Sequence, residues 1–291
     1  MTTPVIAISS AGQMGNAIGH RMTRRGARVL ISLAGRSQES AQRAAKAGMV
    51  NASDADIAAA DFFLSIAPPH EAVSIAQRFA AAIARNERKI VYFECNALSL
   101  ETTKEVGRIV SAAGARFVDG CIIGAAGMPE QDDAGPALYL SGELPSDVAT
   151  LLTLGLRARS TMGPIGAASA LKMAYAGLNK GLTGLAAAMV VAATRAGAAQ
   201  ALHDEMAESQ PQLLKHIAHS MPDMYSKAYR WDFEMREVAR FASTDPEVEK
   251  LFECMASFYA GFAQDWRGDK KVASQIDEFL ATLSSSDERR S

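Results

Sequence analysis

Lys172 is the residue whose type and setting best suit proton-transfer chemistry. It stands in an alanine-rich stretch that follows Gly163-Pro164. If this stretch is helical, Lys172 shares one face with Tyr175 and Asn179, because residues three and four apart along a helix are neighbours. Partial removal from water lowers the pKa of a lysine from its usual value of about 10.4. The residues alone leave two interpretations open: Lys172 as a general acid/base with Asn179 holding it or touching the substrate, or a solvated lysine and a structural asparagine.

A glycine-containing loop near the start of the chain has the spacing of a phosphate-binding turn. Ser10-Ala11-Gly12-Gln13-Met14-Gly15 lies between an apolar run and a helical stretch, and is the GxGxxG pattern with serine in the first place. Gly12 would let the backbone approach a pyrophosphate, and Gly15 would let the helix pack closely on the strand. Free N–H groups at the helix start bind phosphates. The alternative is an ordinary strand-to-helix turn. The residues predicted to bind a dinucleotide here are Ser10, Gly12, Gln13, Met14 and Gly15.

The end of the next expected strand indicates which dinucleotide is bound. NAD sites usually carry an acidic residue there, to hold the ribose hydroxyls. This chain instead has Val29–Ala34 without an acid, followed by Gly35-Arg36-Ser37. A guanidinium and a hydroxyl suit a 2′-phosphate, through charge-assisted hydrogen bonds worth about 1.5–3 kcal/mol each. We therefore predict NADP (NADPH) rather than NAD, bound by Arg36 and Ser37; the alternative for Arg36 is a solvated loop residue.

The elements that must position these residues alternate along the first half of the chain. Strands are expected at residues 5–8, 28–32, 62–66, 90–93, 116–119, 137–141 and 157–161. Helices are expected from the glycine-containing loop to residue 25 and at residues 38–47, 71–83 and 100–113. This alternation predicts an α/β fold in which a Rossmann-type parallel sheet carries helices on both faces. Ala67 and Pro68 follow one strand, at the carboxyl edge where cofactors lie, and are expected cofactor contacts.

After Gly163-Pro164 the sequence is helical throughout, with helices expected at residues 167–199, 210–219, 229–241, 246–262 and 271–283. We predict an NADP-binding domain at residues 1–163 and an all-α substrate and dimerisation domain at residues 164–291, joined by a long interdomain helix. Gly177, Gly181 and Gly184 form a small-residue stripe on that helix. Because glycine costs up to about 1 kcal/mol in a helix, the stripe indicates close packing of another helix, from this chain or from a second subunit. A homodimer is expected.

Composition argues against several classes of protein. The 291 residues carry 30 basic and 32 acidic side chains, a net charge of -2. This balance gives no support for binding to nucleic acid or to an anionic membrane surface. Residues 181–201 are apolar but mostly alanine and glycine, with Arg195 among them, which indicates a packed helix rather than a membrane span.

The reactive side chains do not suggest a metal centre. The three cysteines lie far apart, which argues against a disulfide framework or a zinc site. His216 and His219 have ligand spacing but no evident third ligand, so no metal is predicted. The first residues lack the basic start of a signal peptide. We expect a cytoplasmic protein.

Four stretches, in this order, resemble the β-hydroxyacid dehydrogenase superfamily, which includes 3-hydroxyisobutyrate and 6-phosphogluconate dehydrogenases. They are Ser10–Gly15, 94–99 (Glu-Cys-Asn-Ala-Leu-Ser), 118–124 (Val-Asp-Gly-Cys-Ile-Ile-Gly) and 163–172. Residues 168–173 and 229–235 look closest to the branch whose C-terminal domain has no assigned function. The resemblance covers nearly the whole chain and implies a dimeric dehydrogenase with a Rossmann domain and a helical domain.

The resemblance also implies roles for particular residues. Asn96 would touch the nicotinamide ribose, and Lys172 would be the catalytic lysine. Ile122, Ile123 and Gly124 would lie in the substrate loop. Tyr175 and Trp231 are further expected substrate contacts, with a place in the core as the alternative for Trp231.

Two departures from the family pattern bear on the substrate. Ile123 stands where the family usually has a serine that bonds a substrate carboxylate, and Tyr175-Ala176 stands where Asn or His-Asn is usual. A plain hydroxyisobutyrate-type acid is therefore in doubt, and the sugar-acid decarboxylation of 6-phosphogluconate dehydrogenase is not expected.

Three functions fit these residues. The first is NADP-dependent hydride transfer between nicotinamide and a small hydroxy or oxo compound. The second is imine reduction on the same fold, although enzymes of that type usually carry Asp or Tyr in place of Lys172. The third is a non-catalytic NADPH sensor, which the departures at Ile123 and Ala176 motivate.

Overall fold

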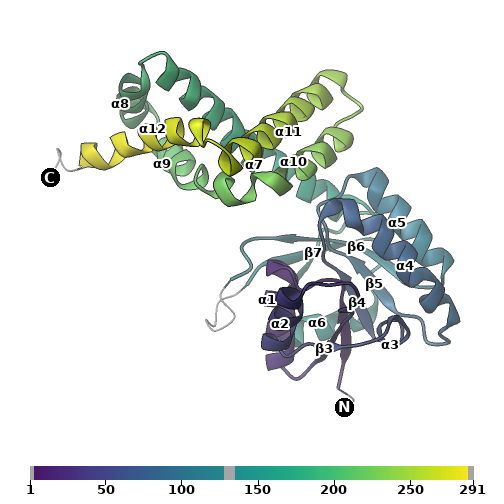
Figure 1. The fold of residues 1–291 in the computed structure, drawn as a ribbon. Coiled ribbons are helices and arrows are strands. Elements are labelled where there is room, and N and C mark those ends of the chain that lie inside the picture. The colour runs from purple at the N-terminus through teal and green to yellow at the C-terminus, as the bar shows by residue number, and fades with distance from the viewer. Residues whose placement is uncertain (1–2, 128–134, 288–291) are drawn as a thin grey trace. The chain divides into compact units, whose positions relative to one another are not determined.

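The computed structural model describes residues 3–127 and 135–287, and the chain divides into two compact units, Met1–Met173 and Ala174–Ser291. The first unit is built on one sheet of eight strands in the order β3-β2-β1-β4-β5-β6-β7-β8 (Figure 1). Neighbouring strands are parallel except β6 and β7, which are antiparallel. The strands are β1 (Val5–Ile8), β2 (Arg28–Ile31), β3 (Val50–Asn51), β4 (Phe62–Ser65), β5 (Val91–Glu94), β6 (Arg116–Ile123), β7 (Ala137–Ser141) and β8 (Arg157–Ser160).

Helices cover both faces of this sheet, as parallel strands joined by crossover helices require. The α-helices of the unit are α1 (Gln13–Arg24), α2 (Gln38–Lys46), α3 (Asp54–Ala58), α4 (Ala72–Arg85), α5 (Leu100–Ala112) and α6 (Ala149–Thr153). Side chains of α1, α2 and α6 bury one face of the sheet, and side chains of α3, α4 and α5 bury the other. The apolar residues of β4 and β5 are buried on both faces, which explains why these strands are continuous apolar runs in the sequence.

The first unit differs from the sequence prediction in four places. β3, α3 and α6 were not predicted, because a strand of two residues and helices of five residues are too short to show a periodicity. β6 continues to Ile123 instead of ending at Asp119, so most of the expected substrate loop is strand. Its extension pairs with β7, with Cys121 opposite Tyr139 and Ile123 opposite Ala137.

The second unit is helical. Its helices are α7 (Ala167–Arg195, which begins in the first unit), α8 (Ala199–Ser209), α9 (Pro211–Ser220), α10 (Asp223–Phe241), α11 (Pro246–Arg267) and α12 (Lys271–Asp287). The prediction continued α7 to residue 199 and missed α8. The break falls at Gly197, whose φ of 73° ends α7 in the left-handed conformation that glycine adopts at helix ends.

The glycine stripe of α7 packs inside this unit. Cβ atoms built at Gly177 and Gly184 would lie 3.2 Å from Phe252 and 2.3 Å from Met255, both on α11. A larger side chain at either position would require Phe252 or Met255 to move. The stripe is therefore accounted for by a helix of the same chain, and it gives no support of its own to a second subunit.

Within the described residues, α7 is the one helix whose length and composition would suit a membrane span, and 39% of its most apolar window is buried. A core helix of a folded domain has the same composition. The compact units divide after Met173, ten residues beyond the predicted boundary at 163. The first residues of α7 stay with the first unit because Ser169 and Lys172 bond to residues of β6.

Candidate functional site

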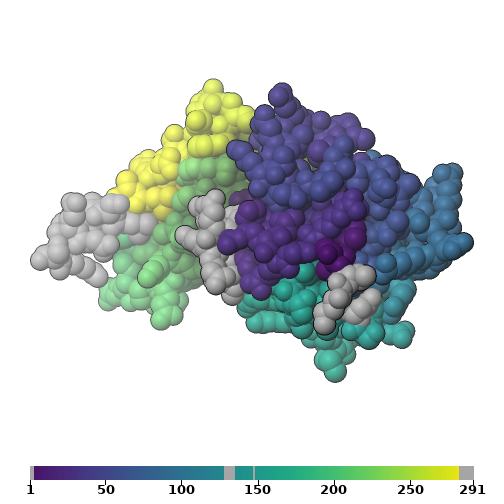
Figure 2. Space-filling view, turned by 90° about the horizontal axis from the view of Figure 1, so that it is seen from below, coloured from purple at the N-terminus to yellow at the C-terminus, as the bar shows by residue number. Residues whose placement is uncertain are grey.

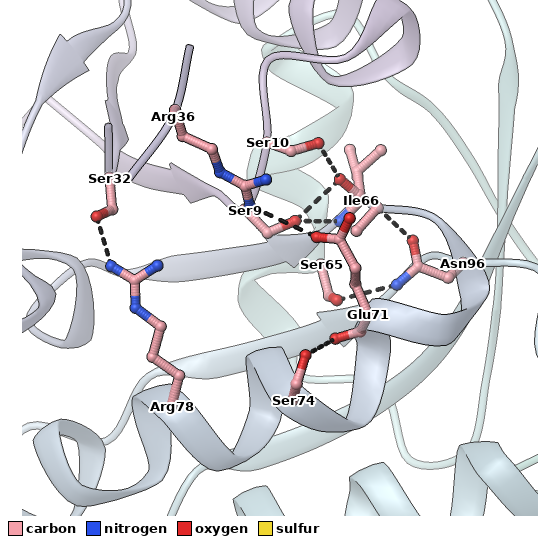
Figure 3. A network of polar contacts seen from close by, with 11 residues as sticks. Ser9, Ser10, Ser32, Arg36, Ser65, Ile66, Glu71, Ser74, Arg78 and Asn96 are labelled. Carbon is pink, nitrogen blue, oxygen red and sulfur yellow. Dashed lines mark hydrogen bonds and ion pairs between the residues drawn. The ribbon is translucent and has the colours of Figure 1, made fainter. Parts of the chain in front are cut away.

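The phosphate-loop segment is fixed to the end of the neighbouring strand by two serines. The hydroxyls of Ser9 and Ser10 donate to the Ile66 carbonyl at 2.9 and 2.7 Å, and the Ile66 N–H donates to Ser9 Oγ at 2.7 Å (Figure 3). These bonds join the carboxyl ends of β1 and β4. Ser10, expected to contact the cofactor, thus shapes the loop from within while still lining a cavity.

The two glycines of the loop have different surroundings. A Cβ at Gly15 would lie 2.0 Å from the Ser10 carbonyl oxygen, so Gly15 is required by the chain's own packing. A Cβ at Gly12 would meet only Ser10 Oγ, at an ordinary 3.7 Å. Gly12 is the N-cap of α1, no side chain caps that end, and its first turn, with Gln13 and Met14, holds no acidic residue. The start of α1 is therefore open to an anion on the side where Gly12 has no side chain.

A cavity of about 190 Å³ adjoins this loop and contains both signs of charge. It is lined by Ser10, Ala11, Gly12, Ile31, Leu33, Arg36, Ser40, Arg43, Pro68 and Glu71. The Arg36 guanidinium lies 3.6 Å from the Glu71 carboxylate, and each side chain is about one-third exposed (31% and 32%). Figure 3 shows these two side chains pointing toward each other. Arg36 thus lies where a 2′-phosphate ligand is expected, but it is paired with an acid.

Arg43 is a cation in this cavity that the sequence analysis missed. Its Nε donates to the Ala11 carbonyl at 3.0 Å, and its Nη2 donates to Ser40 Oγ at 3.0 Å. It also pairs with Glu39 in its own helix. Its position near the middle of the helix that follows Arg36 and Ser37 is the signal that could have identified it.

Ser37 caps α2 with its side chain. Ser37 Oγ accepts from the Ser40 N–H at 3.3 Å and donates to Ser40 Oγ at 3.1 Å. Its hydroxyl is thus engaged with its own helix, and Ser40 is the serine of this helix that lines the cavity. Binding of a 2′-phosphate by Ser37 stays a prediction.

A second cavity, of about 620 Å³, shares Leu33 with the first. It is lined by residues 32–34, residues 51–54, Asp56 and Arg78. The Arg78 guanidinium donates to Asp54 at 2.9 and 2.8 Å and to Ser32 Oγ at 2.7 Å. Together these bonds hold the segment after β2 and the start of α3 against α4. In the space-filling view, the purple segment at the start of the chain and the dark blue segment that follows it lie side by side (Figure 2).

Asn96 organises the ends of β4 and β5. It is 4% exposed, and its Oδ1 accepts from the Ala67 N–H at 2.6 Å while its Nδ2 donates to Ser65 Oγ at 3.1 Å. The side chain therefore holds the segment that carries Ala67 and Pro68. Its expected contact with a nicotinamide ribose stays a prediction.

Glu94, in the same network, was not singled out from the sequence. It is fully buried at the end of β5, and burial raises the pKa of its carboxyl from 4.5 to about 8, although the bond from the Asn96 N–H (2.9 Å) opposes the shift. Glu94 is thus mostly protonated at neutral pH. It provides a neutral polar group beneath the loop rather than a buried charge.

Lys172 is anchored to the far end of β6. Its Nζ donates to the Ile122 carbonyl at 2.8 Å, and the side chain is partly buried. Burial raises the pKa of the neighbouring Cys121 thiol to about 12, with the Lys172 ammonium acting in the opposite direction. Lys172 thus lies at the carboxyl-end edge of the sheet, the edge that carries the phosphate loop.

The residues expected to form a substrate loop near Lys172 lie largely in a strand instead. Ile122 and Ile123 are the last residues of β6, and the side chain of Ile122 is 5% exposed, within the core. Its carbonyl, not its side chain, faces Lys172. Gly124 follows at a φ of 118°, where other residues would be strained.

Asp119 holds the start of α7. The sequence analysis placed it at the end of a strand and in the stretch 118–124 but gave it no role. Its fully buried carboxylate accepts from the N–H groups of Gly166 (2.9 Å), Ala168 (3.1 Å) and Ser169 (3.3 Å). It also accepts from the hydroxyls of Ser141 (2.5 Å) and Ser169 (2.6 Å). One carboxylate therefore caps the helix that carries Lys172.

Three other expected site residues belong to the second unit. Tyr175 is 47% exposed on α7, and Asn179 Nδ2 donates to the Tyr175 carbonyl at 2.9 Å. Trp231 is 7% exposed and packs edge-on against Tyr259 at 5.3 Å between ring centroids. This position fits the core alternative for Trp231. No cluster of His, Cys, Asp and Glu that could hold a metal occurs among residues 3–127 and 135–287.

Comparison with known proteins identifies the fold. Residues 193–261 match the family model described as a domain of unknown function (DUF1932), and no curated protein matches the chain in sequence. A conserved hypothetical protein from Sinorhizobium meliloti 1021 has a similar structure, with a TM-score of 0.69 and 21% identity over 98% of this chain and 97% of that one. Mycobacterium tuberculosis 3-hydroxyisobutyrate dehydrogenase, solved with L-serine, has a TM-score of 0.68 and 19% identity, and the match covers 95% of this chain and 99% of that one. An imine reductase from Myxococcus stipitatus in complex with NADP+ has a TM-score of 0.58 and 16% identity, over 95% of this chain and 100% of that one.

At these identities the likeness establishes the fold. The chain has the fold of the 3-hydroxyisobutyrate dehydrogenases, with a DUF1932 segment in its helical part. The fold class predicted from the sequence is confirmed, and so is the resemblance to the superfamily branch with an unassigned C-terminal domain.

Proposed function

We propose that the protein is an NADP-dependent oxidoreductase that transfers a hydride between nicotinamide and a small hydroxy or oxo compound, with Lys172 as the general acid/base. The observation that carries the proposal is the anchoring of Lys172 Nζ at the carboxyl-end edge of the sheet that also carries the glycine loop. In α/β sheets of this kind, ligands bind at that edge. Two proteins of similar structure were solved in complex with NADP+, which gives further support.

The residues around the loop suit a dinucleotide. The open side of Gly12 and the uncapped start of α1 can receive a pyrophosphate. Arg36 and Arg43 supply positive charge in the adjoining cavity. When bound, NADPH would supply the hydride to a carbonyl carbon.

Lys172 then performs the proton step. Its Nζ gives a proton to the carbonyl oxygen during reduction, so that the product is a neutral alcohol, and it accepts the hydroxyl proton during oxidation. The bond to the Ile122 carbonyl orients the ammonium, while Asp119 fixes the helix start. A group in this role contributes about 10²–10⁴ in rate.

The experiment is a panel of hydroxy acids, alcohols, ketones and cyclic imines, followed by absorbance at the nicotinamide band with NADPH and NADH, or NADP and NAD, in parallel. Turnover of carbonyl–alcohol pairs is expected. Turnover of imines alone would favour imine reduction, which the exposed Tyr175 near Lys172 on α7 keeps as the second candidate. Tight NADPH binding without turnover of any compound would favour a sensor.

We further propose that the protein is a cytoplasmic homodimer. A different face of α7 from the glycine stripe carries a regular apolar row of Tyr175, Leu178, Leu182, Leu185 and Met189. Four of these side chains are 47–75% exposed, and their three- and four-residue spacing is that of a helix-pairing seam. A second copy of the same helix would match this row.

The double variant Leu178→Glu with Leu185→Glu is expected to be a monomer by light scattering. Leu251→Glu, at an exposed site on α11, is the control and is expected to remain a dimer. A wild-type protein that is a monomer at all concentrations would refute the dimer.

A further inference from the structure

The cavity beside the glycine loop contains an acid that the proposed NADP specificity does not explain. Glu71, at the start of α4, faces Arg36 at 3.6 Å, and both line the cavity together with Gly12 (Figure 3). Of the two arginines there, Arg36 is paired with Glu71 and Arg43 with Glu39. The positive charges are therefore largely balanced before any ligand arrives.

This balance affects how strongly a 2′-phosphate is preferred. A phosphate that approaches Arg36 must share the guanidinium with the Glu71 carboxylate, and the two anions repel each other. Arg36 and Glu71 are about one-third exposed, so the competition is partly screened by water. The preference of the site for binding NADPH over NADH is therefore reduced but not abolished.

The same carboxylate can favour the other dinucleotide. β2 ends without an acid to hold a ribose 2′-hydroxyl, which is the usual device of NAD sites. Glu71 brings an acceptor carboxylate to the same cavity from a different element, the start of α4. A free 2′-hydroxyl can donate to it, whereas a 2′-phosphate cannot.

We propose that Glu71 is a specificity-determining residue, which competes with a 2′-phosphate for Arg36 and accepts a hydrogen bond from a free ribose 2′-hydroxyl, so that the site binds both NADPH and NADH. This inference rests on the proposed dinucleotide-binding function. It adds that the choice between the two cofactors is set by the Arg36–Glu71 pair rather than by Arg36 alone.

The test is direct binding, measured by the fluorescence of NADPH and NADH titrated with protein, so no substrate is needed. Glu71→Gln removes the charge and keeps the shape. It should tighten NADPH about five-fold, the upper range for a partly exposed ion pair, and should weaken NADH. Arg36→Gln should shift the ratio of the two dissociation constants in the opposite direction.

Glu87→Gln is the matched control. Glu87 is exposed just beyond the far end of α4. The substitution therefore removes the same charge about 20 Å from Glu71. The inference is supported if Glu71→Gln raises the preference for NADPH over NADH relative to Glu87→Gln. It is overturned if the two variants show the same preference, and the proposed function then still stands. Failure of the wild-type protein to bind either dinucleotide would overturn both.

Discussion

At the scale of single residues, some side chains of the candidate site hold the fold together, while others face open space. Gly15 is needed by the chain, whereas Gly12 faces open space. Ser10 and Asn96 were expected to touch a cofactor, and both make internal bonds that shape the loops there. Residue types and spacing could predict that these positions matter. They could not predict which partners each side chain would have, because those partners come from strands far apart in the sequence.

The two glycines give a matched pair of predictions. Gly15→Ala should lower the free energy of unfolding by several kcal/mol or prevent folding, because its Cβ would lie 2.0 Å from the Ser10 carbonyl oxygen. Gly12→Ala, with a φ of -64° that alanine adopts easily, should leave the melting temperature nearly unchanged. It should nevertheless weaken NADPH binding about ten-fold or more, since a methyl group would occupy the expected approach of the pyrophosphate. Unchanged NADPH affinity in Gly12→Ala would argue against phosphate binding at this loop.

Glu94 predicts a specific pH dependence of stability. Its pKa rises from 4.5 in the unfolded chain to about 8 in the folded protein, so the folded state holds the extra proton between these values. Its contribution to stability is therefore fully present below about pH 4.5 and is lost as the pH rises through about 8. Urea unfolding from pH 5 to pH 9 should show this loss, with a slope of up to about 1.4 kcal/mol per pH unit. Glu94→Gln should remove the slope, whereas Glu105→Gln, at an exposed site on α5, should keep it; identical slopes in both variants would exclude Glu94 as the source.

At the scale of elements, long periodic segments were predictable and short or non-local ones were not. The helices α1, α2, α4 and α5 lie within a few residues of their predicted bounds, because each has an apolar face and most have a clear end signal. The extension of β6 to Ile123 depends on pairing with β7, which the sequence of β6 alone does not reveal. The role of Asp119 was missed for the same reason: its partners lie 22 to 50 residues further along the chain.

The start of α7 depends on the buried Asp119 carboxylate. Asp119→Ala should lower the free energy of unfolding by about 2–5 kcal/mol, because the buried N–H groups of Gly166 and Ser169 lose the acceptor that caps the start of α7. Asp245→Ala removes the exposed cap of α11 and is the matched control, with a cost of about 1 kcal/mol. Denaturant unfolding measures both. Equal small losses in the two variants would mean that Asp119 does not hold α7.

At the scale of the whole molecule, the alternation of strands and helices followed by an all-helical half was sufficient to predict the fold class. The order of the four family-like stretches added the superfamily resemblance, which the shared fold and the DUF1932 match confirm. The glycine stripe was predictable as a packing surface, but the partner helix is α11 of the same chain. A pattern on one helix specifies that a neighbour must approach closely, and it does not specify which helix that neighbour is.

The proposed function depends most on Lys172, as the group that transfers the proton accompanying hydride transfer. The most direct measurement compares turnover of Lys172→Ala with that of the wild type, on the best substrate from the panel, alongside NADPH binding by fluorescence. Lys104→Ala, at an exposed lysine of α5, is the control for loss of one positive charge. We expect Lys172→Ala to lose about 10²–10⁴ in kcat while its affinity for NADPH stays within about two-fold. Turnover equal to that of the Lys104→Ala control would contradict the account.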